Sequence, residues 1–152
     1  MIEVLAVGRM REGPEAMLFA RYAERMRPRL RLREIAEAEG QPAEAKRREA
    51  QMLLAALPDR AYAVALDMAG ASPGSEGFAR LLERWVGLSR PVCFLIGGAE
   101  GLDATVIARA DQVLSLGPMT WPHLFARAML AEQLYRAQSM AAGHPYHRVG
   151  RP

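Results

Sequence analysis

The residues best suited to holding a small ligand are five consecutive positions, 97–101, with the sequence GGAEG. They follow a continuous apolar run at 92–96, and glycine backbone can approach a ligand closely. The segment lacks the lysine and the serine or threonine of a P-loop, and it does not match GxGxxG. No basic residue lies between Pro91 and Ala108, so a phosphate would meet Glu100 without a countercharge. A ligand with adenine, ribose and a positive sulfonium fits this loop better, and a simple tight turn is the alternative interpretation.

A second candidate group is the cationic C-terminal segment. The formal net charge is +3, from 20 basic and 17 acidic residues. Residues 133–152 contain Arg136, Arg148 and Arg151 and no acid, so residues 1–132 hold 17 of each sign and balance. The segment also carries His144 and His147. Such a tail suits an anionic partner such as RNA, and a solvated tail without a function is the alternative.

Every second residue from 25 to 33 is arginine. This period predicts one face of an edge strand, with Leu30 and Leu32 turned inward. The charges then either protect the edge from pairing with another chain or contact a nucleic-acid backbone.

Other chemistries find little support in the sequence. Three histidines and one cysteine make no zinc pattern, so no metal is expected. A GxSxG motif is absent, and Ser115 falls in a predicted strand. Cys93 lies within the apolar run 92–96, which predicts a buried thiol in a reducing, cytoplasmic setting. The sequence has no apolar run of eighteen residues and no basic leader, so neither a membrane span nor a signal peptide is expected.

Strand-like and helix-like runs alternate along the chain. Strands are predicted at 2–8, 30–36, 61–66, 92–96 and 112–116, and helices from 14, then at 43–57, 75–86, 103–110 and 122–142. Residues 67–74 are predicted to form a loop. This order indicates an α/β fold in one domain, residues 1–152, with a mostly parallel sheet of five to six strands and helices on both faces.

In sheets of this kind, ligands bind in loops beyond the carboxyl ends of the strands. Three loops qualify, at 67–74, 97–101 and 117–122. The last helix is apolar over a wide arc, and Glu132 and Arg136 form an i,i+4 pair on its remaining face. An arc this wide predicts a partner helix in a symmetric homodimer, and a fully buried helix in a monomer is the alternative.

Four motifs together resemble a known family. They are FLIGGAEG at 94–101, LGPMTWPH at 116–123, LYRA at 134–137 and HPYHR at 144–148. They are similar to the SPOUT superfamily of knotted methyltransferases, and within it to the ribosomal RNA large subunit methyltransferase H family. The resemblance extends over the whole chain and is strongest from residue 65 onward. Ala99 departs from the glycine-proline-glutamate usual in the family.

The resemblance implies a C-terminal trefoil knot and S-adenosyl-L-methionine as the cofactor. It implies methylation of N3 of a pseudouridine in the 23S rRNA of the large ribosomal subunit. It also implies a homodimer in which the tail of one subunit completes the other's site, with the assembled ribosome as the docking surface. The matching positions for the adenosyl group are Leu66, Gly98, Leu116, Gly117, Pro118, Met119, Thr120, Trp121 and Pro122.

For the chemistry itself, N3 of a uracil ring must lose a proton as it accepts the methyl group. Tail candidates for the base are His144, His147 and Tyr146, and Arg136 or Arg148 would stabilise negative charge on the ring. Arg148 and His144 are the first choices as groups of the substrate site, and the sequence names no single residue as the base. Two other functions remain open. One is an inactive ribosome-binding module of the same fold; the other is a nucleotide-dependent enzyme, which the missing basic residues disfavour.

Overall fold

The computed structural model describes residues 1–150, so the predicted role of Arg151 in the tail lies outside the described residues. Within this range five strands alternate with five helices. The strands are β1 (Ile2–Val7), β2 (Arg31–Ile35), β3 (Tyr62–Ala71), β4 (Val92–Ile96) and β5 (Gln112–Leu114). The helices are α1 (Pro14–Arg25), α2 (Pro42–Ala56), α3 (Ser75–Gly87), α4 (Ala104–Arg109) and α5 (His123–Ala141). The predicted alternation is confirmed.

The strands form one parallel sheet in the order β2-β1-β4-β3-β5. The central strand, β4, is buried along its whole length, as expected for the apolar sequence VCFLI between two covered faces. Cys93 lies in this strand with no exposed surface, which confirms its prediction as a core residue.

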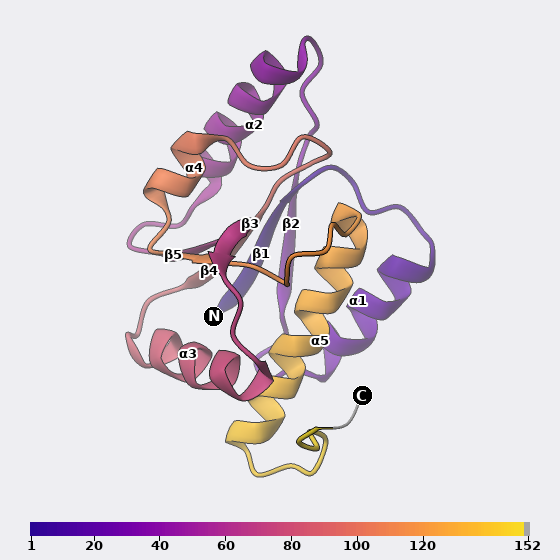
Figure 1. Ribbon diagram of the computed structural model, residues 1–152, viewed down its shortest axis with the longest axis vertical. Helices are drawn as coiled ribbons and strands as arrows, with labels where there is room; N and C mark the ends of the chain where they lie inside the picture. Colours follow the sequence, from indigo (N-terminus) through magenta and orange to yellow (C-terminus); the bar gives the residue numbers. More distant parts are fainter. Residues whose placement is uncertain (151–152) are drawn as a thin grey trace.

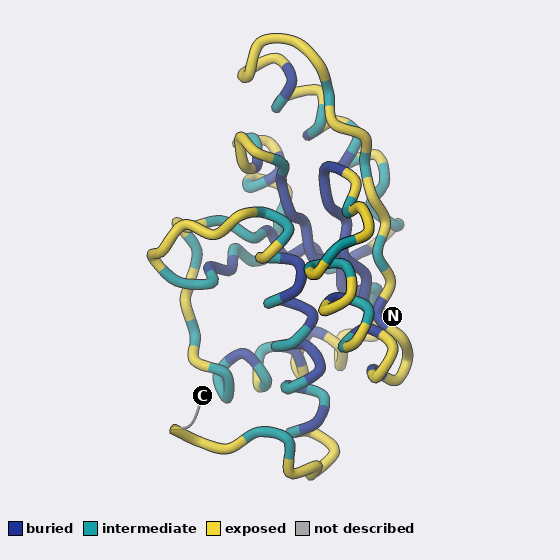
Figure 2. Tube along the Cα trace, turned by 90° about the vertical axis from the view of Figure 1, so that its right-hand side faces the viewer, coloured by how far each residue is buried: buried dark blue, intermediate teal, exposed yellow. Residues whose placement is uncertain are grey.

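Helices cover both faces of the sheet (Figure 1). Successive residues of β1 point to opposite sides, so Val4 joins the core beneath α1, α3 and α5, whereas Leu5 joins the core beneath α2 and α4. Figure 2 shows the buried residues gathered in the centre of the molecule, where β1 and β4 lie, and the C-terminal segment mostly exposed. This layered α/β architecture is the predicted one.

The predicted loop 67–74 is wrong for its first five residues. After an irregularity between Leu66 and Ala71, β3 continues to Ala71, and the Ser115 backbone N–H donates to the Ala71 carbonyl at 2.8 Å. The approach is so close that a Cβ on Gly70 would lie 2.7 Å from the Val113 carbonyl. The small residues Gly70 and Ala71 allow the backbones of β3 and β5 to lie this close together. In the sequence, small residues of this kind were interpreted as part of a loop.

The alternating arginines form a strand only in part. Residues 31–35 are β2, at the edge of the sheet, and Leu30 is buried, as predicted. Arg25, however, ends α1, and residues 26–30 connect that helix to β2, so the strand prediction is wrong for 25–29. The edge charge is partly paired, because an Arg33 Nη2 lies 3.0 Å from a Glu3 carboxylate oxygen.

The connection between β5 and α5 positions the site. β5 is one edge of the sheet, yet the first turns of α5 contact the end of β1, three strands away. Residues 115–122 therefore cross the carboxyl ends of β3 and β4, as Figure 1 shows. The crossing is compatible with the expected trefoil knot, which stays a prediction. Within residues 1–150 no helix is long and apolar enough to span a membrane.

Candidate active site

A cavity of about 760 Å³ lies beyond the carboxyl ends of β3, β4 and β5. This volume is within the roughly 300–1,000 Å³ of small-molecule sites. The structure brings together eight of the nine predicted cofactor residues in its wall, namely Leu66, Gly98, Leu116, Gly117, Met119, Thr120, Trp121 and Pro122. The ninth, Pro118, is exposed in the same loop and does not line the cavity.

Residues 97–101 form a tight turn whose backbone lines this cavity. The Gly101 backbone N–H donates to the Gly98 carbonyl at 3.0 Å, and Gly101 has φ +78°. A Cβ on Gly97 would collide with the backbone of Gly101, and one on Gly98 would lie 3.2 Å from Val7 Cγ1. The interpretation as a tight turn is confirmed, and because the turn also lines the cavity its role as a ligand surface stays a prediction.

The cavity carries negative and no positive side-chain charge. Asp67 and Glu100 line it, and none of its lining residues is arginine or lysine. His123 also lines it, and burial, followed by the Arg127 charge, lowers the pKa of His123, so the imidazole is neutral at pH 7. Such a cavity would bind triphosphates poorly, whereas it fits a ligand that carries a sulfonium and an ammonium and no phosphate.

A carboxylate behind the turn adds to this field. Glu49, on α2, has an oxygen 3.5 Å from the position of a Cβ on Gly98. Burial, then the nearby charges of Glu37 and Glu100, raise the pKa of Glu49. Mutual repulsion of these acids would be relieved by a cation next to the turn.

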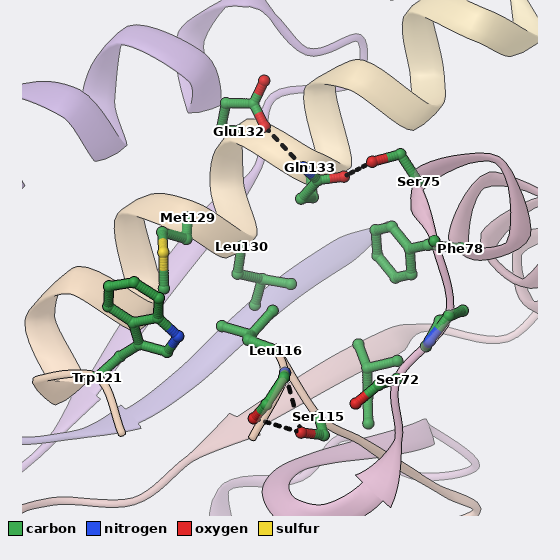
Figure 3. A pocket seen from close by; sticks show the side chains of 14 residues that line it. Ser72, Ser75, Phe78, Ser115, Leu116, Trp121, Met129, Leu130, Glu132 and Gln133 are labelled. Atoms are coloured by element: carbon green, nitrogen blue, oxygen red, sulfur yellow. Dashed lines mark hydrogen bonds between the residues drawn. The ribbon is translucent and has the colours of Figure 1, made fainter. Parts of the chain in front are cut away.

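A second cavity, of about 490 Å³, adjoins the first (Figure 3). It lies between the β3–α3 connection and α5, and the two cavities share the wall formed by residues 114–117 and Trp121. Its floor is apolar, with Phe78 and Leu130, and its polar side includes Glu132 and Gln133. Sequence reasoning did not predict this cavity.

The C-terminal segment folds back onto α5 beside the second cavity. Glu132 is the centre of this network, since the Tyr146 hydroxyl donates to its Oε1 at 3.1 Å and Arg136 Nε donates to the same atom at 3.0 Å. Arg136 Nη1 also donates to His147 Nδ1 at 3.0 Å. Because an arginine can only donate, His147 accepts at Nδ1 and donates from Nε2 to Glu76, 2.8 Å away. The predicted i,i+4 pair of Glu132 and Arg136 is confirmed.

This environment separates the four predicted catalytic residues. Arg136 and Tyr146 meet at Glu132, whereas His144 and Arg148 are exposed. Burial, then hydrogen bonding to Tyr22 and the charge of Glu132, raise the pKa of Tyr146, so its phenol stays protonated and is a poor general base. Hydrogen bonding to Glu132 raises the pKa of Arg136 and keeps it cationic.

Within one chain the outer tail residues lie far from the first cavity. α5 has 19 residues, and at about 1.5 Å per residue it separates its two ends by roughly 28 Å. Trp121 and His123 lie at the beginning of this helix, and His144 lies just beyond its end. A single copy therefore does not bring His144 or Arg148 to the predicted cofactor residues.

A buried arginine, which the sequence interpretation missed, joins α5 to β1. Arg127 has no exposed surface, and its Nη2 donates to the backbone carbonyls of Val7 at 2.5 Å and Gly8 at 3.0 Å. Its Nη1 lies 3.8 Å from a Glu34 oxygen, and among the described residues Nε and Nη1 have no hydrogen-bond partner.

Among residues 1–150, no group of three or more histidine, cysteine, aspartate or glutamate side chains is placed to hold a metal ion.

Comparisons with known proteins agree with this architecture. Residues 1–147 match the family model described as "Predicted SPOUT methyltransferase". A protein of Gluconacetobacter diazotrophicus named ribosomal RNA large subunit methyltransferase H is 67% identical over 151 residues, covering 99% of each chain. A protein of the same name from Acidiphilium cryptum is 54% identical over 99% of this chain and 96% of its own.

Among solved structures, a protein described as a probable methylase family protein from Haemophilus influenzae superposes with a TM-score of 0.59. That match covers 99% of this chain and 72% of the other at 10% identity, so it supports the fold alone. The match to the family model and the identity to the two relatives extend over nearly the whole sequence. The chain therefore belongs to the SPOUT methyltransferase family.

Proposed function

We propose that this protein transfers a methyl group from S-adenosyl-L-methionine to N3 of a pseudouridine in 23S rRNA of the large ribosomal subunit. The observation that carries the proposal is the first cavity, which has acidic side chains and no lysine or arginine in its wall. Family membership and the names of the two relatives support the same reaction. The proposal treats residues 1–152 as one domain and needs no metal.

The cofactor supplies an activated methyl group on a positive sulfur. The chain's own residues would bind and orient it. The turn at 97–101 offers open backbone, Asp67 and Glu100 complement positive charge, and Leu66 and Leu116 provide apolar contact for the adenosyl group. When bound, the cofactor would supply its methyl carbon to N3, and the electron pair of the broken carbon–sulfur bond would stay on sulfur. The N3 proton leaves to a base, and positioning supplies much of the rate.

The C-terminal segment is the proposed RNA-facing group. Arg148 and His144 are exposed and so are free to reach a nucleotide, whereas Arg136 and Tyr146 are held at Glu132. Arg148 would stabilise negative charge on the ring as the proton leaves, and His144 would accept that proton. The partner would be rRNA within the assembled ribosome, in the cytoplasm.

A homodimer would bring the tail of one copy to the first cavity of the other. Arg25, the last residue of α1, contacts Tyr135 of α5, and Arg27, two residues beyond α1, contacts Gln138. The two helices run in the same direction (Figure 1), so the tail and the first cavity lie at opposite ends of this pair within one copy.

The opposite end of this helix pair carries exposed apolar side chains. Met17 of α1 is 74% exposed and Phe125 of α5 is 46% exposed. A second copy packed across this end would cover both residues and place its own tail beside the predicted cofactor residues.

The test is methylation of ribosomes purified from cells that lack this enzyme, followed by mass spectrometry of the 23S rRNA. The wild-type protein should add one methyl group to the target pseudouridine. Arg148→Ala should lower methylation at least about 100-fold, within the range for loss of one charge-stabilising group, while the calorimetric Kd for S-adenosyl-L-methionine stays within about twofold.

The matched control is Arg47→Ala, on the exposed face of α2, which should methylate like the wild type. Equal loss of cofactor affinity in Arg148→Ala would show that the tail builds the cofactor site. Ribosome binding without cofactor binding or methylation would favour the inactive module.

A further inference from the structure

The second cavity adjoins the cavity of the proposed methyl donor. Leu116, Gly117 and Trp121 line both cavities, so the two cavities meet along this wall. Figure 3 shows the second cavity with Leu116 and Trp121 in its lining. Any group held in the second cavity is therefore adjacent to the ligand of the first. Methyl transfer requires direct contact between the acceptor nitrogen and the methyl carbon, and a base in the second cavity would make that contact where the two cavities adjoin.

The lining of this cavity suits a flat, uncharged ring. Phe78, Leu130 and Met129 provide apolar surface, and Trp121, which is 39% exposed, offers an aromatic face at the rim. None of the lining residues is lysine or arginine, so phosphate groups would remain outside. Enzymes that modify a base take it out of the stack and hold it between apolar and aromatic side chains, which is the environment present here.

One polar group in the cavity is held in a fixed orientation. The Gln133 amide accepts a hydrogen bond at Oε1 from the Ser75 hydroxyl, at 2.9 Å, and donates from Nε2 to Glu132 Oε2, at 3.1 Å (Figure 3). Glu132 is in turn held through its other oxygen by Arg136. An amide oxygen has two lone pairs and an amide nitrogen two hydrogens, so Gln133 keeps one acceptor and one donor free.

We propose that the second cavity receives the target base and that Gln133 reads its N–H/C=O edge. The inference rests on the proposed function and identifies the residue that determines base specificity in that reaction. In pseudouridine the sugar is attached to C5, so N1–H lies free beside the C2 carbonyl. Gln133 Oε1 accepts from N1–H and Nε2 donates to the C2 carbonyl, which leaves N3 pointing away from the amide.

This arrangement distinguishes pseudouridine from uridine. In uridine N1 carries the ribose, so the edge that Gln133 reads has no N–H and the amide oxygen would lose its partner. A site built to bond an N–H discriminates strongly against an analogue that lacks it, because its own polar group is left unpaired. Gln133 is therefore a specificity-determining residue, held in position by Ser75 and Glu132.

The experiment compares Gln133→Met with the wild-type chain on two substrates. Methionine keeps the length of the side chain and removes both polar atoms. The substrates are ribosomes that carry the target pseudouridine and ribosomes, from cells lacking the pseudouridine synthase, that carry uridine there. The matched control is Gln51→Met, an exposed glutamine of α2 on the other face of the sheet.

We expect Gln133→Met to lower kcat/KM on pseudouridine ribosomes by about 10- to 100-fold, the effect of one bidentate contact to a base. Activity on uridine ribosomes should change by less than about threefold, so the preference for pseudouridine is lost. The Kd for S-adenosyl-L-methionine and the Tm should match those of Gln51→Met. Ser75→Ala, which removes only one of the two bonds that hold Gln133, should shift the preference in the same direction by a smaller factor.

Two results would overturn the inference. The first is a Gln133→Met protein that keeps the wild-type preference for pseudouridine. The second is a parallel loss of cofactor affinity, which would assign the cavity to the cofactor. A wild-type chain that methylates neither kind of ribosome would instead refute the proposed function, so the two failures are distinguishable.

Discussion

Replacement of the buried Arg127 by methionine tests how α5 is attached to the sheet. Arg127 donates from Nη2 to two buried backbone carbonyls, those of Val7 and Gly8, at the carboxyl end of β1. Methionine fills most of the same space and donates to neither carbonyl. The change therefore isolates the hydrogen bonds from the packing of the side chain.

The expected magnitude is a balance of two opposing effects. Two hydrogen bonds from a charged donor contribute about 1.5–3 kcal/mol each, or roughly 3–6 kcal/mol together. Against this, Nε and Nη1 of Arg127 are buried without hydrogen-bond partners among the described residues, although Nη1 lies 3.8 Å from Glu34. Removal of Nε, which has neither kind of partner, regains about 1–3 kcal/mol. Burial lowers the pKa of Arg127, and Glu34 and Glu37 oppose that shift, so the guanidinium stays charged and its burial is costly.

The midpoints of these two ranges differ by about 2–3 kcal/mol, which is the expected loss in the free energy of unfolding for Arg127→Met. For a chain of 152 residues this corresponds to a Tm lower by roughly 4–12 °C. Scanning calorimetry and urea unfolding at pH 7 measure both quantities. The control is Arg48→Met, which removes an exposed i,i+4 ion pair with Glu44 and should cost no more than about 0.5 kcal/mol.

If Arg127→Met unfolds at or above the wild-type Tm, the reasoning fails. Burying the guanidinium would then cost more than its bonds to the two carbonyls contribute. Apolar packing alone would then attach α5 to the sheet.

Three further predictions concern the turn at 97–101, the buried thiol of Cys93 and Glu49, whose pKa is raised. Gly97→Ala would place a Cβ against the Gly101 backbone, so calorimetry should show at least about tenfold weaker cofactor binding. The same change at Gly87, where a Cβ meets nothing within 4 Å, should leave binding intact. Burial raises the pKa of Cys93 to about 11, so the thiol should not react with Ellman's reagent at pH 8 until urea unfolds the chain, and reaction of the native protein would contradict its burial. Because the pKa of Glu49 is raised above its ordinary value of 4.5, its stabilising contribution is complete below that pH and is lost as the pH rises through the folded value. Glu49→Gln should therefore raise the Tm of the ligand-free protein at pH 7 and have no effect near pH 4, and an equal change at both pH values would argue against the shift.

Periodicity predicted most of the fold because most of the chain is locally consistent. The run at 92–96 is apolar on both faces, and at the start of α4 the Asp103 carboxylate accepts a hydrogen bond from the Thr105 backbone N–H. The extension of β3 to Ala71 was missed because it depends on Gly70 lying against Val113, a partner more than forty residues away. No local pattern contains that contact.

The sequence located the first cavity correctly but did not predict the contacts of the C-terminal segment. Glycine content and the absence of basic residues located the first cavity, because they are properties of the loops themselves. The network of the tail depends on contacts between distant positions, such as His147 with Glu76, 71 residues apart. Gln133 and Arg127 lie within a helix whose other side chains are mostly apolar, so their roles become visible only when their partners on α3 and β1 are placed beside them.

The position of α5 in the chain has a consequence for biosynthesis. Of the described elements this helix is the last to emerge during translation, yet it provides a wall of both cavities and contacts the first strand through Arg127. If the two cavities hold the cofactor and the base as proposed, a nascent or truncated polypeptide that ends before residue 123 would lack the surface that either ligand needs. Such a copy would not compete for the ribosome through these two cavities.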